Sequence, residues 1–139
     1  MIDIEDLLLK PYWIIDILPK QVSTNANGQY FKIEKYCLTP PRVDAIYQKF
    51  ANVLLKLNCY YDMMVCVVDD DKWIKNPEPE LLTQMVLDRK SLNVLFNNAQ
   101  EMISISGDDH YIILYNPDKE ILELINSLAT AEGLHVWEP

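Results

Sequence analysis

Hydrophobic and polar positions change period several times along the chain, and in the first half the changes predict a hairpin, a helix and a strand. The apolar-rich runs Tyr12–Leu18 and Tyr30–Cys37 flank a stretch rich in Ser, Asn and Gly, which predicts two paired strands joined by a turn. Apolar residues recur with a 3.6-residue period over Val43–Leu57, which predicts a helix that packs through one face. The nearly unbroken apolar run Tyr61–Val68 predicts a central strand covered on both faces.

The second half predicts the same order of elements. Two short strands, Met102–Ser106 and Tyr111–Tyr115, flank a Gly-Asp-Asp turn and form a second hairpin. A helix is expected over Asp118–Ala131, and Gly133 suits the position just after its last residue. Leu134–Trp137 then predicts a short closing strand.

Shorter elements fill the remaining segments. Residues 3–9 predict one or two turns of helix capped by Asp3, and residues 81–87 predict a second short helix. Thr39 is expected to cap the long helix of the first half, with Pro40 at its first position. The pattern over residues 91–100 fits either a short strand or a helix end.

Together these elements predict an α+β two-layer sandwich, with a mixed β-sheet and helices mainly on one face. The sheet would be built from two hairpin–helix–strand units, residues 12–68 and 92–137, which share an order of elements but no obvious residue identities. The chain has 139 residues, only three glycines and no Ser- or Gly-rich linker, so we expect a single globular domain over residues 1–139.

The formal net charge of −9 is concentrated in the last third of the chain. Residues 91–139 hold eight acidic side chains and one lysine, a net −7, whereas the first ninety residues are nearly balanced. Such a chain repels phosphate backbones and anionic lipid, so we expect no direct nucleic-acid partner and no membrane partner. It would instead attract a basic protein, although acidity also serves simply to keep a protein in solution.

Cysteine usage and the N-terminus predict a cytoplasmic location. The three cysteines, Cys37, Cys59 and Cys66, are odd in number and lie in apolar or strand-like settings, which fits reduced thiols better than a disulfide framework. The first residues are acidic, unlike a secretory signal, and no apolar run approaches the roughly 20 residues of a membrane span.

Two acidic groups are candidates for chemistry. Asp69, Asp70 and Asp71 follow the predicted central strand, where carboxylates could hold Mg²⁺, but neighbouring strand-end residues point in alternating directions and favour a solvated loop. His110 lies close to Asp108 and Asp109 and could act as a general base, although a histidine in a hairpin turn is the simpler interpretation. No phosphate-binding loop is present, and we expect no metal site and no cofactor.

Two tryptophans are candidates for an interface. Trp73 follows the three aspartates in an expected loop, and Trp137 precedes Glu138 near the end of the chain. Tryptophan is enriched among the residues that dominate binding energies, so either side chain could anchor a partner. The alternative for Trp73 is that it folds back over the edge of the sheet.

These features favour a non-enzymatic, acidic, cytosolic binding protein that recognises a basic protein, as inhibitors and immunity-type proteins do. Its interface is expected among the acidic and aromatic candidates Trp73, Asp69, Asp70, Asp71, Asp108, Asp109, Glu120, Glu123 and Trp137. Two alternatives remain open. One is a small metal-dependent hydrolase that uses the three aspartates with His110, and the other is a subunit of a homo-oligomer.

Overall fold

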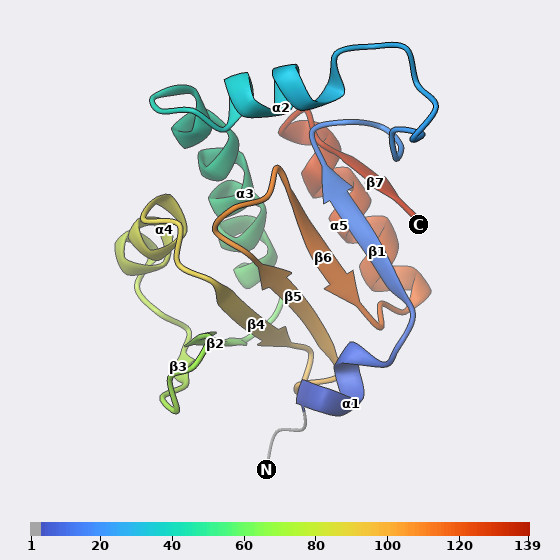
Figure 1. The fold of residues 1–139 in the computed structure, drawn as a ribbon. Helices are drawn as coiled ribbons and strands as arrows, with labels where there is room; N and C mark the ends of the chain where they lie inside the picture. Colours follow the sequence, from blue (N-terminus) through green and yellow to red (C-terminus); the bar gives the residue numbers. More distant parts are fainter. Residues whose placement is uncertain (1–3) are drawn as a thin grey trace.

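A computed structural model describes residues 4–139, and these residues form five helices and seven strands (Figure 1). In chain order the elements are α1 (Ile4–Leu8), β1 (Tyr12–Asp16), α2 (Tyr30–Cys37), α3 (Arg42–Asn58), β2 (Met63–Val67), β3 (Ile74–Lys75), α4 (Pro79–Leu87), β4 (Leu92–Phe96), β5 (Glu101–Ile105), β6 (Tyr111–Tyr115), α5 (Lys119–Ala131) and β7 (His135–Trp137). Asp3, the expected cap of α1, lies outside the described residues.

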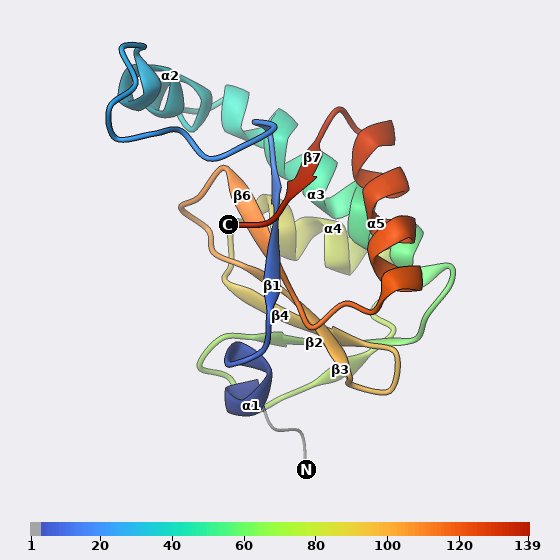
Figure 2. The same ribbon diagram turned by 90° about the vertical axis from the view of Figure 1, so that its right-hand side faces the viewer.

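The strands make one sheet in the order β3-β2-β4-β5-β6-β1-β7. Helices α3, α4 and α5 lie on one side of this sheet, and α1 lies against the other (Figure 2). The predicted two-layer α+β sandwich with helices mainly on one face is therefore confirmed. The sheet, however, is antiparallel at every pairing rather than mixed. The reason is that the helical connections do not join neighbouring parallel strands; β2 lies beyond β4, far from β1.

The main hydrophobic core fills the space between the sheet and α3–α5. The alternation along each strand sends residues such as Ile15, Val94 and Ile112 toward the helices, where they meet Phe50 and Leu54 of α3. All five are essentially inaccessible to solvent. Packing against α3–α5 holds the strands in place. The same strands therefore position the side chains on the opposite face of the sheet.

The opposite face of the sheet is covered only in part. Leu7 of α1 packs on Leu95 and Met102, and Trp73 lies against the same small cluster. This cover spans β4 and β5 and leaves most of the β1–β6–β7 end of the face without a helix over it. We call this uncovered end the open face.

The segment Tyr30–Cys37 was predicted to be a strand, and this prediction is wrong. The segment forms helix α2. Its alternating apolar residues do not mark a buried face, because α2 has no buried residue and Phe31 is 80% exposed. The hairpin predicted over residues 12–37 is therefore not formed, and within residues 4–139 the hairpin–helix–strand order is found in the second half, through β5, β6, α5 and β7.

The start of α3 also differs from the prediction. Pro41 rather than Thr39 precedes the first helical residue, and the Thr39 hydroxyl donates to the carbonyl of Lys35 at 2.6 Å, closing the end of α2 instead. At the other end of the chain, Asp118 caps α5 by accepting the backbone N–H of Ile121 at 2.8 Å. Residues 92–96, for which the pattern allowed two structures, form strand β4.

Candidate functional site

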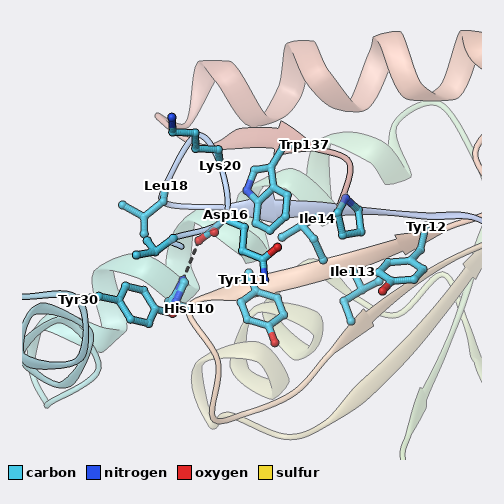
Figure 3. Close-up of a pocket in the computed structure, with 13 residues that line it drawn as sticks. Tyr12, Ile14, Asp16, Leu18, Lys20, Tyr30, His110, Tyr111, Ile113 and Trp137 are labelled. Atoms are coloured by element: carbon cyan, nitrogen blue, oxygen red, sulfur yellow. Dashed lines mark hydrogen bonds and ion pairs between the residues drawn. The ribbon is translucent and has the colours of Figure 1, made fainter. Parts of the chain in front are cut away.

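The open face carries a cavity of about 370 Å³ (Figure 3). Side chains of β1, β6 and β7 form it together with the segment 18–22 after β1, Tyr30 of α2, His110 and Pro139. We call it the open-face cavity. It is lined by Tyr12, Ile14, Asp16, Leu18, Lys20, Gln21, Val22, Tyr30, His110, Tyr111, Ile113, Trp137 and Pro139. A concave, largely apolar site with a few polar groups is the usual form of a ligand-binding site in a protein.

Antiparallel register explains why these side chains meet. Ile14 of β1 pairs with Ile113 on one side and with Trp137 on the other, so the three form a row across the sheet. One pleat further along β1, Asp16 pairs with Tyr111. The intervening residue, Ile15, points into the main core. The cavity is therefore a direct consequence of the two-residue period of the strands.

A buried ion-pair cluster forms one end of the cavity, and we call it the His110 cluster. Its members are Asp16, Tyr30, Glu34 and His110. Nδ1 of His110 lies 2.7 Å from Oδ1 of Asp16, and the two residues are only 3% and 2% exposed. Nε2 lies 2.7 Å from the Tyr30 hydroxyl and 3.1 Å from Oε2 of Glu34. These partners come from β1 and α2, which are far from His110 in sequence.

The hydrogen-bond pattern favours a proton on both ring nitrogens of His110. The Tyr30 hydroxyl donates its proton to Glu34 at 3.0 Å, so toward Nε2 of His110 it can only accept. Asp16 is an acceptor on the other side of the ring. Burial alone would lower the pKa of His110, but the hydrogen bond and charge of Asp16 and the charge of Glu34 outweigh it and raise the pKa.

The tyrosines around this cluster are held in their protonated form. Burial, the hydrogen bond to Glu34 and nearby carboxylates raise the pKa of Tyr30 to about 12. Burial and the charges of Asp109, Asp16 and Glu34 also raise the pKa of Tyr111. Neither phenol supplies a phenolate near neutral pH. Burial is the largest cause of both shifts, and the carboxylates of Asp16 and Glu34 add to it in both cases.

One polar group in the cavity wall is left without a partner. The indole Nε1 of Trp137 is buried and has no hydrogen-bond acceptor among the described residues. A buried N–H without an acceptor destabilises a protein by about 1–3 kcal/mol. An unsatisfied buried polar group in a native structure calls for an explanation, and an acceptor supplied by a ligand or by water is one of them.

The predicted site residues are dispersed over the molecule. Asp108 and Asp109 precede His110 and lie near the His110 cluster, where burial and the charge of Asp108 raise the pKa of Asp109. Trp137 lines the open-face cavity. Glu120 and Glu123 are exposed on α5, in the helical layer on the other side of the sheet.

The three aspartates after β2 lie elsewhere. Asp69, Asp70 and Asp71 are all exposed, and β4 and β5 separate their strand from β6, which follows His110. Three inter-strand steps correspond to about 14 Å. Within residues 4–139, no three His, Cys, Asp or Glu side chains are grouped closely enough to hold a metal ion. Trp73 is half-buried against the small cluster under α1.

Sequence reasoning found His110 together with Asp108 and Asp109, but it missed the side chains that contact the ring, Asp16, Tyr30 and Glu34. A signal for Asp16 was present, since it is the one charged residue within the apolar run Tyr12–Leu18. A charged residue inside a strand that is buried on both faces usually has a buried partner. The partner itself is set by the register of β1 against β6, which the sequence does not show.

Comparison of the chain with known protein families, with curated proteins and with solved structures found no match. Among the helices of residues 4–139, none combines the length and the apolar character needed to cross a bilayer.

Proposed function

We propose that this chain is a non-enzymatic binding protein that recognises a basic protein and inhibits it in the manner of an immunity-type protein. The observation that carries the proposal is the concentration of carboxylates at one end of the open-face cavity. Asp16 and Glu34 contact His110 there, and the charges of Asp108 and Asp109 act on the same surroundings. Such a concentration on a chain of net charge −9 would attract a basic surface.

The groups of the His110 cluster favour binding over catalysis. Both nitrogens of His110 are engaged, the raised pKa of His110 favours its protonated form, and the Tyr30 phenol, with a pKa of about 12, stays protonated near neutral pH. A general base needs a free lone pair at the operating pH. The cluster is thus better suited to supplying charge and rigidity than to transferring a proton.

A cytoplasmic location belongs to the same proposal. Cys37, Cys59 and Cys66 are all unpaired, and the thiol of Cys59 is exposed. Reduced cysteines are typical of proteins in a glutathione-buffered compartment. A basic partner in that compartment would be a protein whose own ligand is acidic, such as a nucleic acid.

The test is the salt dependence of association with a captured partner. The immobilised chain is used to capture proteins from an extract of the source cells, and the association rate of the captured protein is measured from about 0.01 to 1 M salt. Over this range the Debye length falls from about 30 to about 3 Å. We expect a basic partner whose association rate falls steeply with salt. An acidic partner, or a rate that salt leaves unchanged, contradicts the proposal.

A matched pair of charge variants locates the effect. Asp108→Asn with Asp109→Asn removes two charges beside the open-face cavity, and Asp69→Asn with Asp70→Asn removes two at the distant end of the sheet. Both double variants have the same net charge. We expect the first to slow association more than the second, since nearby charges dominate steering. Equal effects would show that only the overall charge matters.

Self-association is the competing explanation for any exposed surface of this chain. Size-exclusion chromatography with light scattering distinguishes the two, because a homo-oligomer has a mass that rises with concentration. We expect the mass of a single chain at every concentration that is accessible.

A further inference from the structure

The open-face cavity has apolar and polar parts in a definite order. Ile14 and Ile113 lie at its centre, and the rings of Tyr12, Tyr111 and Trp137 stand around them (Figure 3). The His110 cluster closes one end. A side chain with an apolar stem and a polar tip would therefore find an apolar surface first and a polar end beyond it.

The sign of the charge at the polar end of the cavity determines whether a cationic or an anionic side-chain tip is favoured there. Two carboxylates, Asp16 and Glu34, flank His110, so the cluster is negative in either state of the ring: its net charge is −1 when the imidazole is protonated and −2 when it is neutral. Asp16 is buried, and the field of a buried charge is screened less than that of a charge in water. Asp109 adds further negative potential beside it. A cation is attracted to this end of the cavity, and an anion is repelled.

The aromatic walls favour the same choice. The faces of Tyr and Trp rings attract ammonium and guanidinium groups, and four such residues line the cavity: Tyr12, Tyr30, Tyr111 and Trp137. Arginine adds a planar group that can stack on these rings.

We propose that the open-face cavity receives one lysine or arginine side chain of the basic partner. This inference rests on the proposed function and deepens it, since it names the part of the partner that enters the site. The stem lies over Ile14 and Ile113, and the cation lies among the aromatic rings within the field of the His110 cluster.

Two groups in the cavity favour the opposite charge and make the proposal testable. Lys20 lies at the cavity and is exposed, and Trp137 offers a buried N–H without an acceptor. A carboxylate ligand could use both. Neutralising Lys20 must therefore strengthen the binding of a cation and weaken the binding of an anion, so Lys20→Gln separates the two occupants by the sign of its effect.

The probes are n-butylguanidinium and n-butylamine as cations, and pentanoate as an anion of similar length. Binding is followed by the indole N–H resonance of Trp137 in the ¹⁵N-labelled chain, which Trp137→Phe identifies by its loss. We expect both cations to shift this resonance saturably, and we expect each cation to have a smaller dissociation constant in Lys20→Gln than in the parent chain. The inference is overturned if pentanoate binds and its dissociation constant is larger in Lys20→Gln than in the parent chain. It is also overturned if no probe shifts the resonance.

A second pair of variants tests the aromatic wall. Tyr111→Leu removes one ring from the cavity, whereas Tyr60→Leu removes a tyrosine that is 64% exposed and does not line the cavity. We expect Tyr111→Leu to weaken butylguanidinium binding by roughly two- to fivefold and to raise the dissociation rate of the captured partner by a similar factor. Tyr60→Leu should leave both unchanged.

The outcomes separate this inference from the proposed function. If a basic partner binds with the expected salt dependence but Tyr111→Leu leaves its dissociation rate unchanged, the proposed function stands and the cavity is not where the partner docks. The same result together with tight butylguanidinium binding would assign the cavity to a free alkylamine or guanidine, which also overturns the inference.

Discussion

The strongest prediction concerns the carboxylate of Asp16, which is replaced by an amide in Asp16→Asn. The change keeps the shape of the side chain, and the Asn oxygen can still accept the proton on Nδ1 of His110, now 2.7 Å from Oδ1 of Asp16. What is lost is the charge. The variant therefore isolates the electrostatic part of the His110 cluster from its packing.

The magnitude follows from the change in the hydrogen bond between residue 16 and His110, in which a neutral acceptor replaces a charged one. A hydrogen bond to a charged group stabilises a protein by about 1.5–3 kcal/mol and a neutral one by about 0.5–1.5 kcal/mol, so the variant should lose about 1–2 kcal/mol of unfolding free energy. In the variant the imidazolium of His110 would be buried with one carboxylate instead of two. His110 then releases its proton more easily, which limits the loss.

The loss depends on pH because the pKa of His110 is raised in the folded protein. A raised histidine pKa stabilises the folded state fully below the unfolded value of about 6.5, and this contribution disappears as the pH rises through the folded value. The difference between Asp16→Asn and the parent chain should thus be largest below about pH 6.5 and shrink in alkaline solution.

Urea unfolding at a series of pH values measures this difference, and NMR titration of the imidazole follows His110 directly. His135→Gln is the control, because it removes the other histidine, which is exposed on β7. His135 lies opposite Asp16 in the strand register, but its side chain is not among the hydrogen-bond or ion-pair partners of His110 in residues 4–139. We expect the control to unfold like the parent chain. A difference between Asp16→Asn and the parent that is constant with pH, or a His110 that titrates below about 6.5 in the parent chain, would refute the assignment of a charged cluster.

Three further predictions test the rest of the fold by urea unfolding. Burial raises the pKa of Glu101, and its Oε2 has no partner among the described residues, so Glu101→Gln should stabilise the chain by about 1 kcal/mol near neutral pH and not below about pH 4. A Cβ at Gly107 would overlap the carbonyl oxygen of Arg89, so Gly107→Ala should destabilise by about 1–3 kcal/mol, whereas Gly28→Ala, with open space around it, should change stability by less than about 0.5 kcal/mol. Asp118→Ala removes the cap of α5 and should destabilise by about 1 kcal/mol, while Asp118→Asn should retain most of the capping.

The elements with a strong period were predicted well from the sequence. The long helix α3 follows the expected 3.6-residue pattern within a residue or two at each end, and β5 and β6 pair across the expected turn. These elements bury a continuous face, so each apolar position reports directly on packing. The antiparallel arrangement of the whole sheet was not accessible in this way, since strand order depends on which strands lie side by side rather than on any local pattern.

The candidate site was predicted only in part, and the reason is separation along the chain. His110 contacts Asp16, 94 residues away, and Tyr30, 80 residues away. Charge reasoning pointed to the acidic neighbours of His110 in sequence, Asp108 and Asp109, which lie near the cluster but are not among the hydrogen-bond partners of the ring in residues 4–139. The contacts that fix the protonation of His110 come from elements whose placement is a tertiary property.

The error over residues 30–37 is the one that matters most for the site. In a strand, Tyr30 and Glu34 would share a face but lie about 13 Å apart, too far to reach one imidazole. In α2 they are four residues apart along a helix, about 6 Å, and both meet Nε2 of His110. None of the residues of α2 is fully buried, and only its C-terminal end, through Cys37 and the following Leu38, packs against the main core. The His110 cluster links the N-terminal half of the helix to β1 and to the residue before β6. Because this half of the helix is held by polar contacts, the pattern of apolar residues gives little sign of it.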